Sequence, residues 1–246
     1  MSYHQEAVLR DGTSVVIRHV GKADLDAIKA LFSRMSPTSI HHRFFAAKRE
    51  LVPSDLVWLD RLDGDDEVAL AAVLNERVIG IGRYTVVEKG IAEVAFDVAD
   101  ADQGRGIGTL LLEHLARIAR ARGLTAFRAE VEADNEQMLD VFGRSGFPVR
   151  DDLSKGIYRV EFPIAESQRF VRVAADRERR AAAKSLRSVF APHSVAVIGA
   201  SRTPGSIGRA ILDNLIRDGF HGPIYPIHPE AKELSGRRCY ASIGAV

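Results

Sequence analysis

Residues 103–108, with the sequence QGRGIG, constrain the fold of this chain more than any other segment. Residues 91–98 precede them with the alternation of a strand, and apolar residues then recur at helical spacing as far as Ile118. Alternation returns at residues 127–131. Strand, glycine loop, helix and strand in this order form a crossover, and a crossover of this length joins parallel strands. The sequence therefore predicts a pair of parallel strands around the loop.

Two further strands, residues 68–74 and 78–87, are predicted directly before residues 91–98. Their connectors are short turns, and this forces antiparallel pairing because a parallel crossover needs a dozen residues or more. Gly80 and Gly82 lie inside the middle strand and predict a bulge or a close approach by another segment.

Shorter signals complete a first domain. Asp11 and Gly12 predict the turn of an N-terminal hairpin. Pro53 begins a short helix, with Ser54 or Asp55 available as its N-terminal cap. Further helices and a last strand are predicted at residues 25–35, 39–45, 137–144 and 158–162. The expected fold class is α/β, more strictly α+β, with a mixed, mostly antiparallel sheet flanked by helices.

The chain changes character after residue 164. Residues 165–187 are rich in arginine and predict a solvated, basic helical linker. A nucleic-acid or membrane patch is the less favoured interpretation, because aromatic residues are few and the charges fall on all sides. Residues 188–246 begin a second strand–loop–helix–strand unit, which we expect to be a truncated Rossmann-like βαβ domain from a longer protein. The first domain then spans residues 1–164.

The glycine loop has the chemistry of a phosphate site. A helix N-terminus presents unpaired N–H groups and the positive end of the helix dipole. Gly104, Gly106 and Gly108 carry no side chain that would hold a phosphate away from those amides. Gln103 and Arg105 can add donors. A loop of this kind also fits a plain turn, so its place between a strand and an amphipathic helix carries the inference.

Glu93 is a candidate proton acceptor in the strand before the loop. Alternation places it on one face with Ile91, Ala95 and Asp97, in otherwise small or apolar company. Glu93 and Asp97 are about 13 Å apart at the usual strand rise, so they do not form a close carboxylate pair. A carboxylate can take a proton from an amine directly or through one water. A solvated strand residue is the alternative for Glu93, and it is the favoured interpretation of Asp97.

Residues 92–147 resemble the acetyl-CoA core of the GNAT N-acetyltransferases. The family pattern Q/R-x-x-G-x-G/A is matched in full by Gln103, Gly106 and Gly108. The similarity continues to Asn135 and to the pair Gly146-Phe147. Residues 9–20, 36–45 and 48–51 are similar to the bacterial Pat-type protein lysine acetyltransferases, and the resemblance covers about residues 6–164.

Residues 185–229 resemble the start of the CoA-binding domain of NDP-forming acyl-CoA synthetases. An NAD-binding fingerprint is the alternative for this segment. It fits poorly, because the loop is longer than G-x-G-x-x-G and His228-Pro229 stand where an acidic residue would bind a ribose.

The resemblance implies acetyl-CoA as the co-substrate, held between two splayed parallel strands. Its pyrophosphate would lie on residues 103–108, including Ile107, and its pantetheine would pair with the backbone of Phe96 and Val98. Asn135 would belong to the same site. Glu93 matches the glutamate that acts as general base in Pat-type enzymes. The implied function is transfer of an acetyl group to a protein lysine, with acyl-CoA synthetases as the expected partners.

One residue departs from the family pattern. Many GNAT enzymes have a tyrosine that protonates the leaving thiolate, and Phe142 stands near that place here. The general acid therefore stays open among water, Ser145 and a backbone group. Cys239 lies outside the domain, which favours direct transfer over a cysteine intermediate. Three alternative functions are a small-molecule amine acetyltransferase, a non-catalytic acyl-CoA sensor and an NAD-dependent oxidoreductase built on the C-terminal motif.

Composition excludes other classes of protein. The chain is 46% hydrophobic and 27% charged with a formal net charge of +1, so no basic excess points to nucleic acid. No apolar run approaches the roughly 20 residues that span a bilayer, and the N-terminus lacks a signal-peptide core. A lone cysteine excludes a multi-cysteine metal site. We expect a cytoplasmic protein with no metal and no nucleic-acid or membrane partner.

Two pairs of neighbouring residues, one of histidines and one of phenylalanines, have no predicted role in metal binding or acceptor binding. His41 and His42 point about 100° apart on a helix, so they cannot chelate one metal together. Phe44 and Phe45 favour core packing over a place in an acceptor groove.

Overall fold

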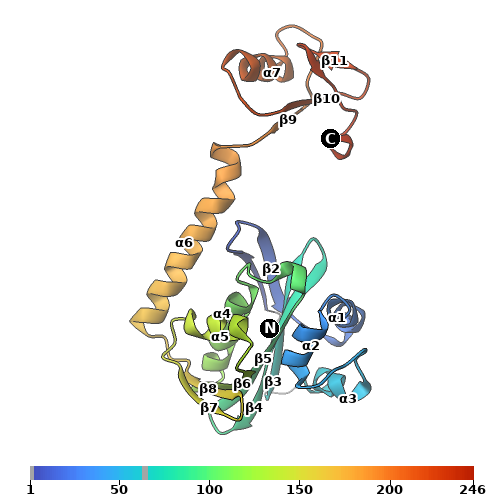
Figure 1. Cartoon of the computed structure of the whole chain (residues 1–246). Coiled ribbons are helices and arrows are strands. Elements are labelled where there is room, and N and C mark those ends of the chain that lie inside the picture. Colours follow the sequence, from blue (N-terminus) through green and yellow to red (C-terminus); the bar gives the residue numbers. More distant parts are fainter. Residues whose placement is uncertain (1–2, 63–65) are drawn as a thin grey trace. The chain divides into compact units, whose positions relative to one another are not determined.

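The computed structural model describes residues 3–62 and 66–246, which form two compact units that divide between Ser185 and Leu186. Eight strands of the first unit form one sheet in the order β1-β2-β3-β4-β5-β6-β8-β7 (Figure 1). They are β1 His4–Val8, β2 Ser14–His19, β3 Glu67–Leu74, β4 Arg77–Glu88, β5 Ile91–Val98, β6 Ala126–Glu132, β7 Arg150–Ser154 and β8 Ile157–Pro163. Only β5 and β6 pair in parallel among the described strands of this sheet, which confirms the mixed, mostly antiparallel prediction.

Helices cover both faces of this sheet (Figure 1). One face carries α1 Leu25–Phe32, α2 Pro37–Phe44, α3 Pro53–Leu56 and the short 3₁₀ helix Val57–Arg61. The other carries α4 Ile107–Ala121 and α5 Glu136–Gly143. Both faces of β3 are therefore buried: Leu70 packs in the α4 core and Ala71 in the α1 core. This explains why the β3 sequence is apolar without interruption.

The packing of α4 on the sheet explains the two glycines of β4. A Cβ at Gly80 would lie 2.8 Å from Cγ2 of Ile107, and a Cβ at Gly82 would lie 3.0 Å from the ring of Phe96. The β3–β4 register also shifts at Ala72, directly opposite Gly80. Both parts of the sequence prediction, bulge and close approach, are confirmed. They bring the start of α4 down onto the sheet.

Two local predictions need correction. The strand β7 was missed, because its residues RDDLS are all exposed and show no apolar alternation; the backbone ladder with β8 alone defines it. At the start of α3 the N-cap residue is Val52, and not Ser54. The Asp55 carboxylate accepts a hydrogen bond from the Val52 N–H at 3.0 Å, so Asp55 acts from inside the helix.

The helix α6, Gln168–Phe190, packs on the first unit along much of its length. Phe170 is nearly buried and stacks on Phe147 with ring centroids 4.5 Å apart. Further along, Ala181 is buried and Arg177 forms an ion pair with Glu113 of α4. The prediction of a helix is confirmed, but the prediction that it is solvated is wrong for this part.

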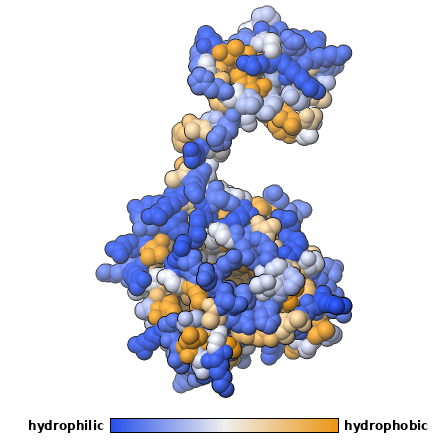
Figure 2. All heavy atoms as spheres, viewed as in Figure 1, coloured by the Kyte–Doolittle hydropathy of each residue, from blue (hydrophilic) through white to orange (hydrophobic). Residues whose placement is uncertain are grey.

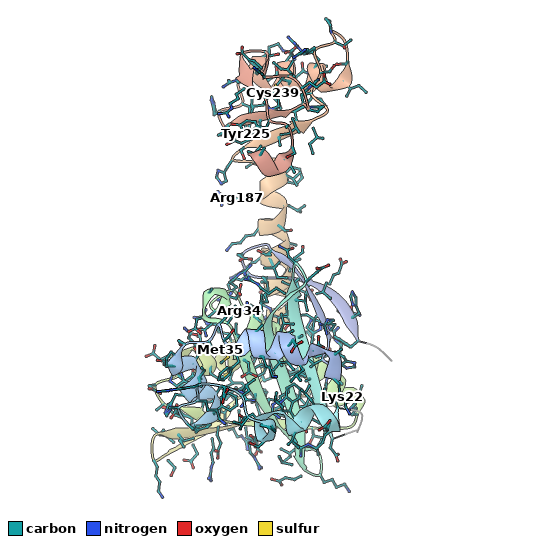
Figure 3. All side chains as sticks on the ribbon, turned by 90° about the vertical axis from the view of Figure 1, so that its right-hand side faces the viewer. Lys22, Arg34, Met35, Arg187, Tyr225 and Cys239 are labelled. Atoms are coloured by element: carbon teal, nitrogen blue, oxygen red, sulfur yellow. The ribbon has the colours of Figure 1, made fainter. Side chains whose placement is uncertain are left out.

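The second unit contains β9 Val195–Ile198, α7 Ile207–Arg217 and β10 Ile224–Ile227, with β9 and β10 parallel. The short strands β11 Glu233–Leu234 and β12 Arg237–Arg238 pair with each other. Figure 2 shows a largely hydrophilic surface on the visible side of each unit. Cys239 and Tyr225 belong to this unit, and Arg187 belongs to α6 (Figure 3). None of the helices in the described residues is long and apolar enough to cross a membrane.

Candidate functional site

The parallel strands β5 and β6 separate after a short paired stretch. Their register runs from Ile91 opposite Ala126 to Glu93 opposite Arg128, and no pairing between them is found beyond that point in the described residues. The rest of β5 keeps its partner β4 on the other side, as far as Val98 opposite Gly80. One edge of β5 is therefore open from Val94 to Val98.

Alternation along β5 decides which backbone groups line that open edge. The Ala99 N–H donates to the Ile79 carbonyl, so the odd-numbered residues direct their backbone groups to β4. Phe96 and Val98 then direct theirs into the gap. The carbonyl oxygen of Val98 already accepts a hydrogen bond there from Nε2 of Gln103, at 3.2 Å.

The glycine loop presents unpaired amides next to this gap. Gly104 and Gly106 have φ values of +72° and +88°, which a residue with a side chain rarely adopts. Among the described residues, the backbone N–H groups from Gly104 to Thr109 have no acceptor. They surround the N-terminus of α4, whose dipole favours a bound anion. A Cβ at Gly104 would meet nothing within 4 Å, so the space beside the amides is open. A pyrophosphate therefore fits this loop.

A cleft of about 560 Å³ joins the gap, the loop and two helices. Its wall is formed by the α2 side, by β5, by the loop and by the start of α5. Of the candidate residues, it is lined by Glu93, Phe96, Val98, Gln103, Gly104, Gly106, Ile107, Gly108 and Asn135. These residues come from widely separated parts of the chain, and the fold brings them to one cavity.

Arg105 is the candidate residue that does not line the cleft. Its guanidinium bonds to Asp11 at 2.6 Å, to Asp102 at 2.6 Å and to Thr13 at 3.0 Å. Each of its three guanidinium nitrogens thus donates to a protein oxygen. Arg10 lines the cleft instead, and its sequence position does not predict this because its place depends on where the N-terminal hairpin lies.

Glu93 stands where β5 and β6 part. Its side chain is exposed and lines both the cleft and a second pocket of about 520 Å³, which Arg128 and Glu130 also line. It forms no ion pair or hydrogen bond with the other described side chains. Asp97 is paired with Arg43 at 2.8 Å, so of the two carboxylates on this face only Glu93 is unengaged.

The N-terminus of α2 is tied to the loop through Asp100. This carboxylate accepts hydrogen bonds from the Ser36 N–H at 2.7 Å and the Ser39 hydroxyl at 3.0 Å. Burial alone would raise the Asp100 pKa, but these serine donors outweigh it and hold the pKa below its usual range. Nε2 of Gln103 donates to the same Ser39 hydroxyl at 3.1 Å. The amide of Gln103 therefore organises the loop and is already partnered.

Asn135 has a structural role at the far side of the cleft. Its Oδ1 accepts a hydrogen bond from the Met138 N–H at 3.1 Å and caps α5. A Cβ at Gly108 would lie 3.1 Å from Cγ2 of Val141, so Gly108 allows α4 and α5 to approach. Both residues therefore shape the wall of the cavity.

Phe142 and Ser145 are both buried. Phe142 packs against Phe96 and Phe162, and its ring has no group that can donate a proton. The hydroxyl of Ser145 donates to the Phe142 carbonyl at 2.6 Å and does not line the cleft. Ser145 is thus out of reach as a general acid. Phe45 is 42% exposed and lines the cleft, so the preference for core packing is wrong there.

The two histidines of α2 contact carboxylates, and the pair His42 and Asp134 lines the cleft. Nε2 of His41 lies 3.1 Å from Glu132, and Nε2 of His42 lies 3.2 Å from Asp134. His42, Glu132 and Asp134 offer one ligand atom each within 4.8 Å, which is the group in the described residues with metal-binding spacing. Through these contacts the histidines connect α2 to the end of β6.

A mixed sheet with splayed parallel strands, and a glycine loop at a helix N-terminus, define an acetyltransferase architecture. The sequence pattern of the GNAT acetyltransferase family matches residues 28–147, and that of a CoA-binding domain matches residues 193–246. Acetyltransferase PA5475 of Pseudomonas aeruginosa is 32% identical over 165 residues, which cover 64% of this chain and 89% of that protein. This chain belongs to the GNAT acetyltransferase family, and the enzyme is an acyltransferase.

Two further relatives match one unit each. Acetyltransferase Pat of Mycolicibacterium smegmatis is 33% identical over 155 residues, 60% of this chain and 46% of that protein. An ADP-forming acetate–CoA ligase of Archaeoglobus fulgidus is 53% identical over 58 residues, which are 24% of this chain and 9% of the ligase. The second unit thus corresponds to a small part of such ligases.

Solved structures support the same fold. The GNAT domain of S. lividans PAT is 35% identical with a TM-score of 0.59, and the match covers 65% of this chain and 96% of that one. The yncA protein of Salmonella typhimurium, solved with its cofactor acetyl-CoA, has a TM-score of 0.52 at 21% identity. That match covers 63% of this chain and 96% of yncA, and it bears on the fold alone.

Proposed function

We propose that this enzyme transfers the acetyl group of acetyl-CoA to the ε-amine of a lysine in another protein. One arrangement carries the proposal: a free carboxylate, Glu93, stands at one end of a cleft whose other end presents unpaired amides from Gly104 to Thr109. The amides of the loop can bind the phosphate end of a long thioester, and Glu93 lies near its reacting end. The open edge of β5 lies between them.

Each part of the cleft has a distinct task in this proposal. The loop amides and the α4 dipole bind the pyrophosphate. The backbone of Phe96 and Val98 binds the amide groups of the pantetheine, and Asn135 shapes the opposite wall. Acetyl-CoA supplies an activated acyl group as a thioester. The residues of the protein therefore need only to orient it and to manage protons.

Glu93 manages the first proton. A lysine amine has an ordinary pKa of about 10.4, so it reaches the cleft protonated and must become neutral before it attacks. Glu93 takes that proton, directly or through one water. The amine nitrogen forms a bond to the acetyl carbon and gives its second proton to water, the C–S bond breaks, and the thiolate leaves with the electron pair. Water protonates the thiolate, because neither Phe142 nor Ser145 can do so.

A protein acceptor is supported by the shape and surface of the cleft mouth. The exposed ring of Phe45 lies there, with the phenylalanine in a left-handed conformation that turns the chain away at the end of α2. The similarity to Pat-type acetyltransferases supports a lysine as the acceptor. The second unit resembles part of an ADP-forming ligase, and acyl-CoA synthetases are the proposed targets.

We also propose the organisation of the chain. The acetyltransferase domain ends near residue 164, residues 165–187 form most of the connecting helix, and residues 188–246 bind a CoA or nucleotide phosphate. Gly208 supports the last assignment, since a Cβ there would lie 2.0 Å from the Gly199 carbonyl oxygen and only glycine lets α7 approach its loop.

Mass spectrometry of acetylated products tests the acceptor. The chain is incubated with acetyl-CoA and a purified acyl-CoA synthetase, and in parallel with a panel of free amines. We expect site-specific acetylation of one or a few lysines of the synthetase, lost in the Glu93→Gln variant. Modification of free amines alone would refute a protein acceptor, and CoA binding without any transfer would identify a sensor.

A further inference from the structure

We propose that the turn of the β1–β2 hairpin, residues 10–13, holds the glycine loop in its CoA-binding conformation and itself rests on α6. Arg105 is then a positioning residue that joins the hairpin to the loop and does not bind the cofactor. This inference rests on the proposed acetyl-CoA site. It concerns the affinity of that site, not the chemical step.

Three hydrogen bonds connect the hairpin turn to a single loop residue. Nε of Arg105 donates to Oδ2 of Asp11 at 2.6 Å, and Nη2 donates to the Thr13 hydroxyl at 3.0 Å. The Arg10 N–H donates to the Arg105 carbonyl at 3.0 Å. Both the side chain and the backbone of Arg105 are thus held by the hairpin.

The fourth contact of Arg105 fixes it to the base of the loop. Nη1 donates to Oδ1 of Asp102 at 2.6 Å, and Asp102 is almost fully buried. The planar guanidinium fork is therefore shared between one carboxylate on the hairpin and one below the loop. Gly104 and Gly106, on either side of Arg105, have positive φ and no side chain to anchor them. The position of Arg105 consequently sets the direction of the neighbouring amides.

The other side of the hairpin turn contacts α6. Gly12 has a φ of +93°, and a Cβ on it would lie 2.8 Å from the Ser185 nitrogen and 2.9 Å from the Lys184 carbonyl carbon. These are backbone atoms of a helix, which cannot move aside as a side chain would. Gly12 is therefore required for the close approach as well as for the turn.

The contacts form one continuous chain from the helix to the phosphate site. The backbone of α6 contacts Gly12, the neighbours Asp11 and Thr13 hold Arg105, and Arg105 lies between the two loop glycines. Glu93 lies on β5 and has no part in these contacts. A change at the hairpin turn should therefore alter CoA binding and leave the rate at saturation nearly unchanged.

The first experiment removes the charge at the hairpin. CoA is titrated into the full chain and into Asp11→Asn by calorimetry, and kcat and KM for acetyl-CoA are measured for both. We expect CoA binding to weaken about five- to tenfold, the size of a typical coupling between sites, with kcat within about twofold. Equal affinity in the two proteins would overturn the inference. A wild-type chain that does not bind CoA would overturn the proposed function as well.

The second experiment tests the contact with α6. Gly12→Ala inserts a methyl group against the helix backbone, and Gly123→Ala is the matched control, with φ of +82° and nothing within 4 Å of its Cβ. Both variants carry the strain of a left-handed alanine, but only Gly12→Ala displaces α6. We expect a raised KM for acetyl-CoA in Gly12→Ala alone. An equal rise in both variants would show that the effect is general strain and would refute the contact's role.

Discussion

Arg105 and Glu93 are two charged candidate residues with very different contacts. Arg105 stands inside the glycine loop, yet its donors bond to Asp11, Thr13 and Asp102. Glu93 lies at the other end of the cleft and is exposed to it. Asp97, on the same face of β5, forms an ion pair with Arg43. Residue type and spacing predict a functional role for both residues, whereas their contacts favour a supporting role for Arg105 and leave Glu93 free for the proposed proton transfer.

At the residue scale, Glu93→Gln tests the general base. General bases of this kind contribute about a hundredfold or more to rate, so kcat should fall by about that factor. KM for acetyl-CoA should change little, because the amides of the loop are untouched. The loss should shrink as pH rises toward the lysine pKa, where the acceptor deprotonates without help.

The matched control for Glu93 is Glu130→Gln, on the neighbouring strand β6, where Glu130 lines the same second pocket. Glu130 is paired with Arg159 and does not line the cleft. We expect its steady-state rates to stay within about twofold of wild type. Equal losses in the two variants would mean that surface charge, and not proton transfer by Glu93, determines the rate.

His114 gives a prediction for stability against pH. Burial, followed by the nearby Arg117 and Arg177, lowers its pKa from 6.5 to about 4. The Tyr3 hydroxyl contacts Nδ1 of His114, and an unprotonated Nδ1 can accept a hydrogen bond from that hydroxyl. The imidazole of His114 takes up a proton near pH 6.5 in the unfolded chain and only near pH 4 in the folded one, so the contribution of His114 to folding stability falls as pH falls through that window. Glu113 contributes in the opposite direction, because burial raises its pKa to about 7. Between pH 7 and pH 5 the contribution of His114 to the free energy of unfolding falls by about 2 kcal/mol.

Urea unfolding at pH 7 and pH 5 measures this effect. His114→Gln cannot be protonated, so its free energy of unfolding should be lower than that of the wild type at pH 7, and this difference should shrink by about 2 kcal/mol at pH 5. Parallel pH dependence in the two proteins would mean that His114 does not titrate on unfolding.

At the scale of elements, the approach of α4 to β4 places the start of the helix beside the open edge of β5. Gly80→Ala puts a methyl group 2.8 Å from Ile107 and 3.2 Å from the Asp97 carbonyl oxygen. Overpacking of this kind costs about 1–3 kcal/mol, and we expect that loss in chemical denaturation. Because Ile107 lines the cleft, CoA affinity should fall as well.

Gly143→Ala is the control for Gly80→Ala. It lies at the end of α5 with nothing within 4 Å of its added Cβ. The alanine should be neutral or stabilise the protein by up to about 1 kcal/mol, because glycine is the poorer helix former. Tolerance of Gly80→Ala to the same degree would mean that α4 can move away from the sheet without cost.

At the scale of the whole molecule, the two units have separate cores. Phe170 of α6 belongs to the core of the first unit, and Leu212 of α7 to the core of the second. The second unit is small, and units of its size bury little surface and are marginally stable. Heating should therefore give two transitions.

Core substitutions assign these transitions. Phe170→Ala and Leu212→Ala each remove a buried side chain and should each cost about 3 kcal/mol. In scanning calorimetry, Phe170→Ala should lower only the transition of the first unit, and Leu212→Ala only that of the second. One transition that moves with either substitution would mean that the units unfold together.

Long, periodic elements were predictable from sequence. The stripe Ile107, Leu111 and Leu115 gave α4, and the alternation of β5 put Glu93 on the opposite face from Phe96, as the burial pattern confirms. Short polar elements were not. The residues of β7 gain their conformation from backbone pairing with β8, which leaves no mark in residue type. The packed side of α6 was missed for a related reason, since its many arginines hide the buried positions Phe170 and Ala181.

By itself the sequence determined the order of elements, the antiparallel and parallel pairings, and the glycine loop at a helix N-terminus. Local periodicity, connector length and the glycine positions encode these features, and each acts over a few residues. Only the tertiary structure decided that Arg10 faces the cleft, that Arg105 does not, and that Gly12 meets α6. Those facts depend on contacts between residues about 90 or more positions apart in the sequence. Tertiary packing, and not local sequence, decides which of these residues meet.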